Sequence, residues 1–594
     1  MARNSVRQDE DIQKHSKLEI SKRLFKYLNP YRGKVFFVVF LMIFVMLIGI
    51  LNPYLLKVAI DTNITNNDLP GLVIIGFVML ILNYLALLAS RKRIKTMASV
   101  TNNIMVNIRH ELYGHIQKLS FSFFDNRPVG KILARVIGDV NALQELFNNS
   151  ITNFIPELLS LVCVTIVMMT MNYRLALLAI AILPFLAVAM FLIETISRKR
   201  WQQFRKKRSN MNAYTHEQFS GIRIVQGYAT EEASSKAFSQ LLKEMMDSFI
   251  SAVRLNDLFW PLVELSWGIG SIIVYWYSVK LIGMGVTVGT VIAFSSYIGM
   301  FWRPILNISS FYNTLITNFA AADRIFDIMD IKPDISDSDT VAKMPKIKGK
   351  VEFKNVSFSY EDGVTVLDKV SFEIPAGETV ALVGATGAGK TTIVNLISRF
   401  YDTSSGKVLI DGINVKDVEL ESLRSQMGIM LQDTFLFSTT IKENIRYGKL
   451  DATDEEVIAA AKAVNAHDFI MKLPKGYDTD VNERGSRLSV GQRQLISFAR
   501  ALLANPRILI LDEATSNIDT ATERLVQKGI QKLLMGRTSF VIAHRLSTIR
   551  DCNRIMVIND GRIVETGSHE ELMKLKGSYY TLYMSQYKFL NEGA

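Results

Sequence analysis

Residues 380–397 have the sequence VALVGATGAGKTTIVNLI, and this stretch decides the fold of the C-terminal part of the chain. The apolar run at 380–383 predicts a buried strand and the run at 393–397 predicts a helix, with a glycine-rich loop between them. Such a loop gathers backbone N–H groups, a helix N-terminus and the ammonium of Lys390 around one point, which suits a bound phosphate. Glycine is needed because a Cβ would keep the backbone away from the phosphate oxygens.

The same loop predicts how a nucleotide and its metal ion would be held. Lys390 can reach the β- and γ-phosphate oxygens, and the hydroxyl of Thr391 can bind Mg²⁺. Residues 508–513, ILILDE, predict a buried parallel strand that delivers Asp512 to the magnesium site and places Glu513 to polarise a water molecule. The predicted nucleotide-binding residues of the loop and helix are Gly384, Ala385, Thr386, Gly387, Ala388, Gly389, Lys390, Thr391 and Thr392.

The length and composition of the chain indicate a membrane protein with more than one domain. A chain of 594 residues is too long for one hydrophobic core, and a hydrophobic share of 49% with a mean hydropathy of +0.19 exceeds what a soluble enzyme needs. The net charge of +12 does not point to nucleic acid, because the basic residues lie mostly between apolar spans. Cys163 and Cys552 offer neither a disulfide framework nor a set of metal ligands.

Six apolar stretches are each near the roughly 20 residues that a helix needs to cross a bilayer. The connection after the first stretch carries Asp61 and Asp68, whereas those after the second and fourth are rich in Lys and Arg, at 91–95 and 198–208. The positive-inside rule therefore predicts that both chain ends lie in the cytoplasm. The expected location is the plasma membrane of a bacterium. The predicted spans are 35–56, 71–90, 151–171, 175–196, 258–284 and 286–308.

Three short segments are expected at the cytoplasmic side. Apolar residues at near-helical spacing in 20–28 favour a helix on the membrane surface, although a solvated tail fits equally well. The two cytoplasmic connections keep helical periodicity and are broken by Pro and Gly near 123–130 and by Gly near 217–223. Each break predicts a short helix that docks on the nucleotide domain, or else a simple turn between two helices.

The charged residues within the predicted spans include Glu157, Glu264 and Arg303. A charge facing lipid costs on the order of 2.5–3.5 kcal/mol by insertion scales, so these side chains are expected to face a cavity, a partner helix or an interface. Glu264 and Arg303 are candidates for a substrate path, and both can equally lie near the bilayer boundary and extend their charges toward water.

The predicted domains are a transmembrane part at 1–326 with six spanning helices, a polar linker at 327–350, and a nucleotide-binding domain at 351–594, which opens with an alternating strand. The expected fold class is a membrane α-helical bundle with long cytoplasmic extensions, followed by an α/β P-loop domain.

Four motifs together resemble the ATP-binding cassette of ABC transporters: GATGAGKT at 384–391, LSVGQRQ at 488–494, LILDEAT at 509–515 and VIAHRLS at 541–547. The six preceding spans resemble the exporter type, in which the transmembrane part is fused N-terminal to the cassette. The resemblance covers the chain from about residue 24 to 586 and implies that two cassettes sandwich two ATP molecules, so that one chain is half of a dimeric transporter.

The resemblance also implies roles for single residues. Tyr360 would stack on adenine, Gln432 would contact Mg²⁺ or water, and His544 would contact the γ-phosphate, although His544 taken alone is more typical of a structural histidine. Glu483 would contact the docking helix of the partner. The implied catalytic residues are Glu513, His544 and Gln432; the implied magnesium ligands are Thr391, Gln432 and Asp512; the residues implied to contact ATP across the dimer are Ser489, Val490, Gly491, Gln492 and Asp519.

Two departures from the family pattern concern the dimer. Val490 replaces the first glycine of the usual LSGGQ signature, a β-branched residue where close approach to phosphate is expected, and the loop 516–519 reads SNID instead of SALD. Because Glu513 and His544 are kept, the combination resembles one member of a heterodimeric exporter with one weak and one competent ATP site. A homodimer remains the alternative.

The predicted function is ATP-driven export of lipophilic or amphipathic molecules, such as drugs or lipids, by alternating access, with ATP and Mg²⁺ as cofactors. The expected partners are a second ABC half-transporter, membrane lipid and a small-molecule substrate, with no nucleic acid. Alternatives are export of a peptide or another specific solute, and an ATP-gated channel or regulator on the same scaffold. The six spans argue against a soluble cassette ATPase.

Overall fold

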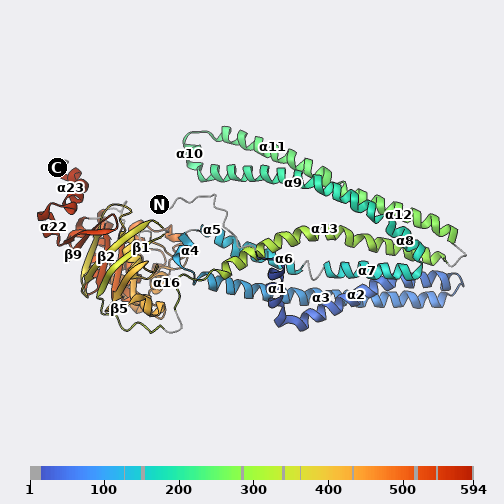
Figure 1. Ribbon diagram of the computed structural model, residues 1–594, viewed down its shortest axis with the longest axis horizontal. Helices are drawn as coiled ribbons and strands as arrows, with labels where there is room; N and C mark the ends of the chain where they lie inside the picture. The colour runs from blue at the N-terminus through green and yellow to red at the C-terminus, as the bar shows by residue number, and fades with distance from the viewer. Residues whose placement is uncertain are drawn as a thin grey trace. The chain divides into compact units, whose positions relative to one another are not determined.

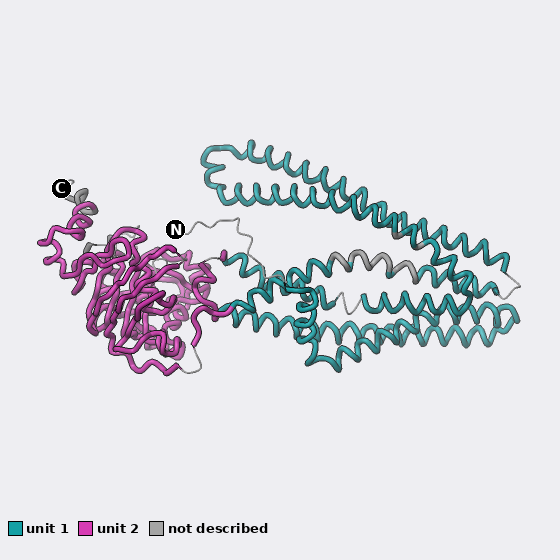
Figure 2. The backbone as a smooth tube through the Cα atoms, in the orientation of Figure 1, with its two compact units in different colours: residues 1–117, 129–331 teal, residues 118–128, 332–594 magenta. Residues whose placement is uncertain are grey.

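The computed structural model of the chain separates into two compact units (Figure 2). Unit 1 comprises residues 1–117 and 129–331, and unit 2 comprises residues 118–128 and 332–594. The short segment 118–128 therefore belongs with the C-terminal unit, although it interrupts the N-terminal unit in sequence. The structure describes residues 15–125, 127–148, 154–281, 286–337, 341–360, 363–430, 434–513, 520–543 and 546–591.

Unit 1 is built of helices, because an apolar segment in a bilayer can satisfy its backbone N–H and C=O groups within a helix. Short 3₁₀ and π-helical turns at Asn29–Tyr31, Ala59–Ile64 and Ala134–Asp139 interrupt the α-helices. The helices are α1 (Lys17–Leu28), α2 (Arg32–Val58), α3 (Leu69–Ile116), α5 (Val129–Leu133), α6 (Val140–Phe147), α7 (Ile155–Met171), α8 (Tyr173–Ala181), α9 (Leu183–Ser220), α10 (Ile222–Gly227), α11 (Glu231–Asn256), α12 (Phe259–Leu281) and α13 (Val288–Asp330).

The predicted membrane spans fall on these helices. Each of the six predicted spans overlaps one of six apolar helical segments found in the described part of the chain. Four of these segments are long and apolar enough to cross a membrane, and two are shorter apolar helices. The four are Lys17–Ile64, Leu69–Ile116, Tyr173–Ser220 and Glu231–Leu281, and the shorter two are Ile155–Met171 and Val288–Met300.

Two helices extend far beyond their apolar stretches, as the sequence predicted. α3 has 48 residues and α9 has 38. α9 and α11 lie side by side and are joined by α10 (Figure 1), and Lys207 Nζ on α9 donates to Glu244 Oε2 on α11 over 2.6 Å. The break predicted near 217–223 falls at Gly221, between α9 and α10.

The N-terminal helix α1 confirms the predicted helix over 20–28 and extends it to Lys17, with Ser16 as its N-cap. Its apolar stripe is buried against protein, because Ile20, Leu24 and Leu28 are each at most 9% exposed. Tyr27 donates its hydroxyl to Glu111 Oε2 on α3 over 2.6 Å. This segment is therefore a packed element of unit 1: it is neither a solvated tail nor a helix whose apolar stripe faces a membrane surface.

Unit 2 contains two sheets. One has the strand order β2-β1-β4-β5 with antiparallel pairs, and the other has the order β10-β9-β3-β8-β7-β6, which is parallel except for β10 at its edge. The strands are β1 (Val351–Ser359), β2 (Thr365–Ile374), β3 (Thr379–Val383), β4 (Ser405–Ile410), β5 (Ile413–Asn414), β6 (Met427–Met430), β7 (Ile508–Glu513), β8 (Thr538–Ala543), β9 (Arg554–Asn559) and β10 (Arg562–Gly567).

The helices of unit 2 surround these sheets, and the first of them, α4, comes from the segment that interrupts unit 1. They are α4 (Phe121–Asp125), α14 (Lys390–Ile397), α15 (Leu420–Arg424), α16 (Ile441–Arg446), α17 (Asp454–Ala463), α18 (His467–Met471), α19 (Val490–Ala504), α20 (Thr520–Leu534), α21 (Leu546–Arg550), α22 (His569–Leu575) and α23 (Ser578–Asn591).

The parallel strands are buried on both faces, which is why their sequences are continuously apolar. In β3, Val380 and Leu382 join the core shared with the antiparallel sheet, whereas Ala381 joins the core formed with α17, α19 and α20. In β7, Ile508 and Ile510 join the first of these cores, and Leu509 and Leu511 join the second. The carboxyl ends of β3 and β7 consequently open at one edge of the sheet, where ligands of α/β folds bind.

Candidate nucleotide-binding site

Three glycines set the backbone path of the loop between β3 and α14. Gly384, Gly387 and Gly389 have φ angles of +157°, +87° and +107°, a region that favours glycine. A Cβ at Gly389 would lie 2.7 Å from Leu367 Cδ2, and a Cβ at Gly384 would lie 2.2 Å from the carbonyl oxygen of Ile558. A Cβ at Gly387 would meet nothing within 4 Å, so the backbone there is open to a ligand.

Lys390 crosses this loop and donates from Nζ to the carbonyl oxygens of Gly384 and Ala385, each over 2.8 Å. The Ala388 N–H donates to the Ala385 carbonyl oxygen over 3.2 Å and closes the turn. Burial lowers the pKa of Lys390, and the charge of Asp512 opposes that shift. A buried ammonium favours an anion beside it, so the loop fits the phosphates of ATP.

Asp512 lies at the end of β7, at the edge where the loop after β3 also emerges. β7 pairs with β8 and β8 pairs with β3, all parallel. Thr391 is exposed in the first turn of α14, whereas Thr392 is buried. Carboxylate and hydroxyl oxygens of this kind are the ligands that Mg²⁺ prefers.

Tyr360 follows β1 and stands beside α14. Its hydroxyl lies 3.2 Å from Thr392 Oγ1, and its ring meets the ring of Tyr401 edge to face, with 5.0 Å between centroids. The side chain of Tyr360 is nearly half exposed, so one face of the ring is available for stacking.

The signature motif forms the N-terminus of α19. Ser489 caps this helix: its Oγ accepts from the Gln492 N–H over 3.2 Å, and Gln492 Oε1 accepts from the Ser489 N–H over 3.0 Å. Val490 is 36% exposed and Gly491 is buried.

The side chains of several predicted site residues lie outside the part of the chain that the structure describes. Gln432, Asp519 and His544 lie outside the described residues. Glu513 is the last residue of β7, and its side chain also lies outside the described part. Thr386 lies in the loop and is exposed.

The segment around α4 docks on the nucleotide-binding unit, which confirms the docking predicted near 123–130. Ser122 Oγ donates to Asp334 Oδ2 over 2.6 Å, and the rings of Phe121 and Phe400 lie 4.4 Å apart between centroids. The docking helix itself begins at Phe121, two residues before the predicted break.

Tyr401 links this docking helix to the nucleotide site. Its hydroxyl donates to Asp125 Oδ2 at the end of α4, while its ring packs on Tyr360. Burial, followed by the hydrogen bond to Asp125, raises the pKa of Tyr401. Sequence analysis missed this residue; the adjacent aromatic pair after α14 is the only local signal, because the contact joins residues far apart in the chain.

The second predicted docking segment, α10, exposes apolar side chains. Ile224 is 66% exposed and Tyr228 is 80% exposed, and Phe219 beside them is also exposed. Glu483, the residue implied to meet a partner's docking helix, is exposed in the 3₁₀ turn Glu483–Gly485. Clusters of exposed apolar residues commonly mark protein interfaces.

A bundle of membrane-length helices joined in one chain to a P-loop α/β unit defines an ATP-driven membrane transporter. The chain belongs to the ABC transporters, with the exporter arrangement of a transmembrane part followed by the ATP-binding cassette. The family model for the ABC transporter transmembrane region matches residues 35–305, and the ABC transporter model matches residues 367–516. It is an ATP hydrolase coupled to export, and ABC exporters function as dimers.

Similar proteins cover nearly the whole chain. An ABC transporter ATP-binding protein of Bacillus subtilis, YknV, is 44% identical over 98% of this chain and 96% of its own length. An ATP-dependent lipid A-core flippase of Syntrophus aciditrophicus is 38% identical over 97% and 96%. The structure of a bacterial Atm1-family ABC exporter with ATP bound matches with a TM-score of 0.77 and 27% identity, over 93% of this chain and 98% of that one.

Proposed function

We propose that this chain is one subunit of a heterodimeric exporter that moves lipophilic or amphipathic molecules, such as drugs or lipids, out of a bacterial cell. The observation that carries the heterodimer is Val490, exposed in the first turn of α19 beside the helix-capping Ser489. A β-branched side chain there keeps a phosphate from approaching the helix N-terminus as closely as glycine would allow. Of the two ATP sites in the dimer, the one that this signature completes would then be the one with weak ATPase activity.

The residues of this chain would build the competent site together with an unaltered signature from the partner. MgATP supplies the phosphoanhydride bond that is hydrolysed. Lys390 would hold the phosphates, and Thr391, Asp512 and Gln432 would hold the magnesium ion. Glu513 would polarise the attacking water molecule, and His544 would contact the γ-phosphate. Tyr360 would stack on the adenine ring, and Asp519 would belong to the dimer interface.

An apolar hollow in unit 1 supports a lipophilic cargo. It has a volume of about 510 Å³ and is lined by side chains of α8, α9 and α12. Its lining includes Leu178, Ile182, Phe185, Leu262, Ser266 and Ile273. Ile269 also lines a neighbouring hollow that contains Glu264, so a carboxylate lies near an apolar surface, as a cationic amphiphile would require.

The relatives support the same cargo class. The names of two of them describe a lipid A-core flippase and a putative multidrug export protein, the latter 37% identical over 96% of this chain. Export then follows from closure of the paired cassettes on ATP, which the docking segments pass to the membrane helices. The positive-inside pattern favours a topology with both chain ends and the cassette in the cytoplasm.

The test separates the heterodimer from the homodimer. The chain is purified alone and together with a candidate half-transporter that carries LSGGQ and lacks an acid at the position equivalent to Glu513. Both preparations are reconstituted in vesicles, and ATPase activity and uphill transport of a lipophilic dye or labelled lipid are measured. We expect full, substrate-stimulated turnover only in the pair.

The inactive control is Glu513→Gln in the pair, which should retain bound ATP and lose turnover by a factor of about 10²–10⁴, the range for removal of a general base. Full substrate-stimulated turnover by the chain alone would reject the heterodimer. ATP hydrolysis without uphill accumulation of any cargo would favour a channel or regulator over a pump.

A further inference from the structure

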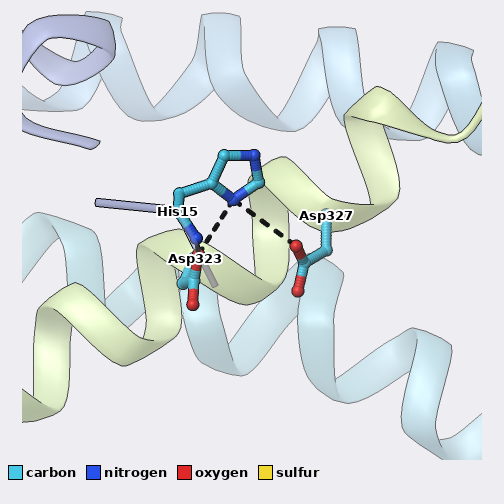
Figure 3. A group of neighbouring side chains, drawn as sticks. All are labelled: His15, Asp323 and Asp327. Atoms are coloured by element: carbon cyan, nitrogen blue, oxygen red, sulfur yellow. Dashed lines mark hydrogen bonds and ion pairs between the residues drawn. The ribbon is translucent and has the colours of Figure 1, made fainter. Parts of the chain in front are cut away.

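One imidazole near the N-terminus faces three carboxylates of a single helix. His15 precedes α1, and Asp323, Asp327 and Asp330 follow one another at helical spacing near the C-terminal end of α13. His15 Nδ1 lies 2.9 Å from Asp323 Oδ1 and 3.5 Å from Asp327 Oδ1, and Nε2 lies 3.0 Å from Asp330 Oδ2. Figure 3 shows the ring nitrogen between the first two carboxylates.

This arrangement requires a positive charge between the groups. A neutral imidazole carries one N–H, so with Nε2 donating to Asp330 its Nδ1 would direct a lone pair at two carboxylate oxygens. The side chains are largely buried, with exposed fractions of 9% for His15, 17% for Asp323 and 20% for Asp327. Either a proton on Nδ1 or a cation must offset the negative charge.

The charges around His15 are mostly negative. Arg23 pairs with Asp330 over 2.7 Å, but Glu19 adds a further negative charge in the first turn of α1. A proton on Nδ1 can serve one carboxylate oxygen at a time, whereas a divalent ion can be shared by all three ligand atoms.

The spacing of the three atoms also fits an ion. Ligand atoms at about 2.1 Å from a tetrahedral or octahedral metal stand about 3.0–3.4 Å apart. The three ligand atoms of His15, Asp323 and Asp327 all lie within 4.8 Å of one another, and the two distances from Nδ1 bracket the ideal value. Asp330 on the other ring nitrogen would fix the tautomer, as a carboxylate does behind many metal-bound histidines.

We propose that His15 Nδ1, Asp323 and Asp327 bind one divalent transition-metal ion such as Zn²⁺, which fastens α1 to the C-terminal end of α13. Three protein ligands leave a coordination position for water. The site joins the first described residue of the chain to the helix that leads directly into unit 2, so it restrains both ends of unit 1's sequence at once. Its residues are other than those of the candidate nucleotide site.

The test is metal uptake by the full-length protein, purified without a polyhistidine tag, stripped with a chelator and kept free of nucleotide. Zn²⁺ is titrated by calorimetry, and Co²⁺ is titrated by its visible absorption, which reports nitrogen and oxygen ligands. We expect one equivalent per chain. His15→Gln and Asp327→Asn should each weaken binding at least about tenfold, as loss of a supporting group at a metal site does.

His216→Gln is the matched control, because His216 is exposed on α9 and away from the cluster in sequence; it should bind as the wild type does. The melting temperature of each variant in chelator shows that it is folded, and Zn²⁺ should raise that temperature in the wild type and the control alone. Equal uptake by wild type and His15→Gln would overturn the proposal. So would a wild type that takes up no ion, which would leave an imidazolium as the charge between the carboxylates.

Discussion

Val490 illustrates how one side chain can limit what binds at the N-terminus of a helix. The capping box of Ser489 and Gln492 gives α19 a well-formed N-terminus, which is the element that an ATP molecule held by another cassette would contact. The isopropyl group of Val490 adds bulk at the point where glycine would leave the backbone bare. Val490 leaves α19 itself intact and obstructs only the space at its N-terminus.

Val490→Gly distinguishes the two dimers. In the proposed heterodimer the competent site takes its signature from the partner, so the substitution should leave the steady-state ATPase rate within about twofold. In a homodimer the substitution would remove the valine side chain from both ATP sites and raise the ATPase rate several-fold. ATPase rates of the purified dimers decide between these outcomes. Val564→Gly, at an exposed valine of β10, controls for the loss of a side chain in the same unit.

The residues that sequence analysis found are those whose neighbours in space are neighbours in sequence. Lys390 contacts the carbonyl groups of its own loop, five and six residues earlier, so a motif contains the whole arrangement. Tyr401 contacts Asp125, 276 positions away, and His15 contacts Asp323, 308 positions away. No local pattern identifies such pairs, because they depend on packing between elements.

The docking helix α4 contacts Tyr401, whose ring packs on Tyr360 of the candidate nucleotide site. Tyr401→Phe removes the hydroxyl that donates to Asp125 and keeps the ring that packs on Tyr360. A hydrogen bond to a charged group is worth about 1.5–3 kcal/mol. We expect basal ATPase activity to persist while substrate stimulation falls several-fold, measured in vesicles with and without cargo.

Tyr447→Phe is the control for that experiment, because Tyr447 is an exposed phenol of the same unit whose ring packs on Phe437. Stimulation should be unchanged in this variant. Equal stimulation in Tyr401→Phe and wild type would show that the hydroxyl has no part in the coupling.

The contact between Asp139 and α13 is expected to be a principal support of unit 1. Asp139 accepts from Arg324 Nε over 3.0 Å and from Arg135 Nη1 over 3.2 Å, and it is 8% exposed. Asp139→Asn should destabilise the protein by about 1.5–3 kcal/mol, because the hydrogen bonds from two arginines lose their charged acceptor. The midpoint of thermal unfolding in detergent is the measurement, and it should fall clearly.

Glu244→Gln provides the comparison. Glu244 pairs with Lys207 over 2.6 Å outside the predicted spans, both side chains are about 40% exposed, and exposed ion pairs contribute little. Its midpoint should stay close to that of the wild type. A similar midpoint for Asp139→Asn would mean that Arg324 and Arg135 find other partners.

The hydrophobic periodicity and the composition of the sequence predicted most of the helices and strands. The apolar spans became helices, and the continuous apolar runs before Gly384 and at 508–511 became strands buried on both faces. The limits of elements were less predictable. α13 continues to Asp330, into the segment expected to be a linker, because its last turns are held by α1 and Asp139 and not by their own composition.

The chain has one docking helix, α4, that is engaged within unit 2, and one predicted docking helix, α10, whose apolar side chains are exposed. Ile224→Asp should therefore leave the isolated chain folded, with an unchanged melting temperature. In the dimer it should reduce substrate-stimulated ATPase activity and transport by about tenfold or more, because a charge would be buried without a partner at the docking surface.

Gln226→Asp places the same charge on the same short helix, at an exposed polar position. It should behave as the wild type. If both variants transport normally, α10 has no docking partner in the working transporter.

The unbroken length of α3 has a mechanical consequence. Its 48 residues form a rod about 72 Å long, at 1.5 Å per residue, with its only proline in the first turn. A tilt of about 5° about one end of such a rod carries the other end through about 6 Å. In the proposed exporter, a small tilt of α3 would therefore be enough to open a path for a lipophilic molecule.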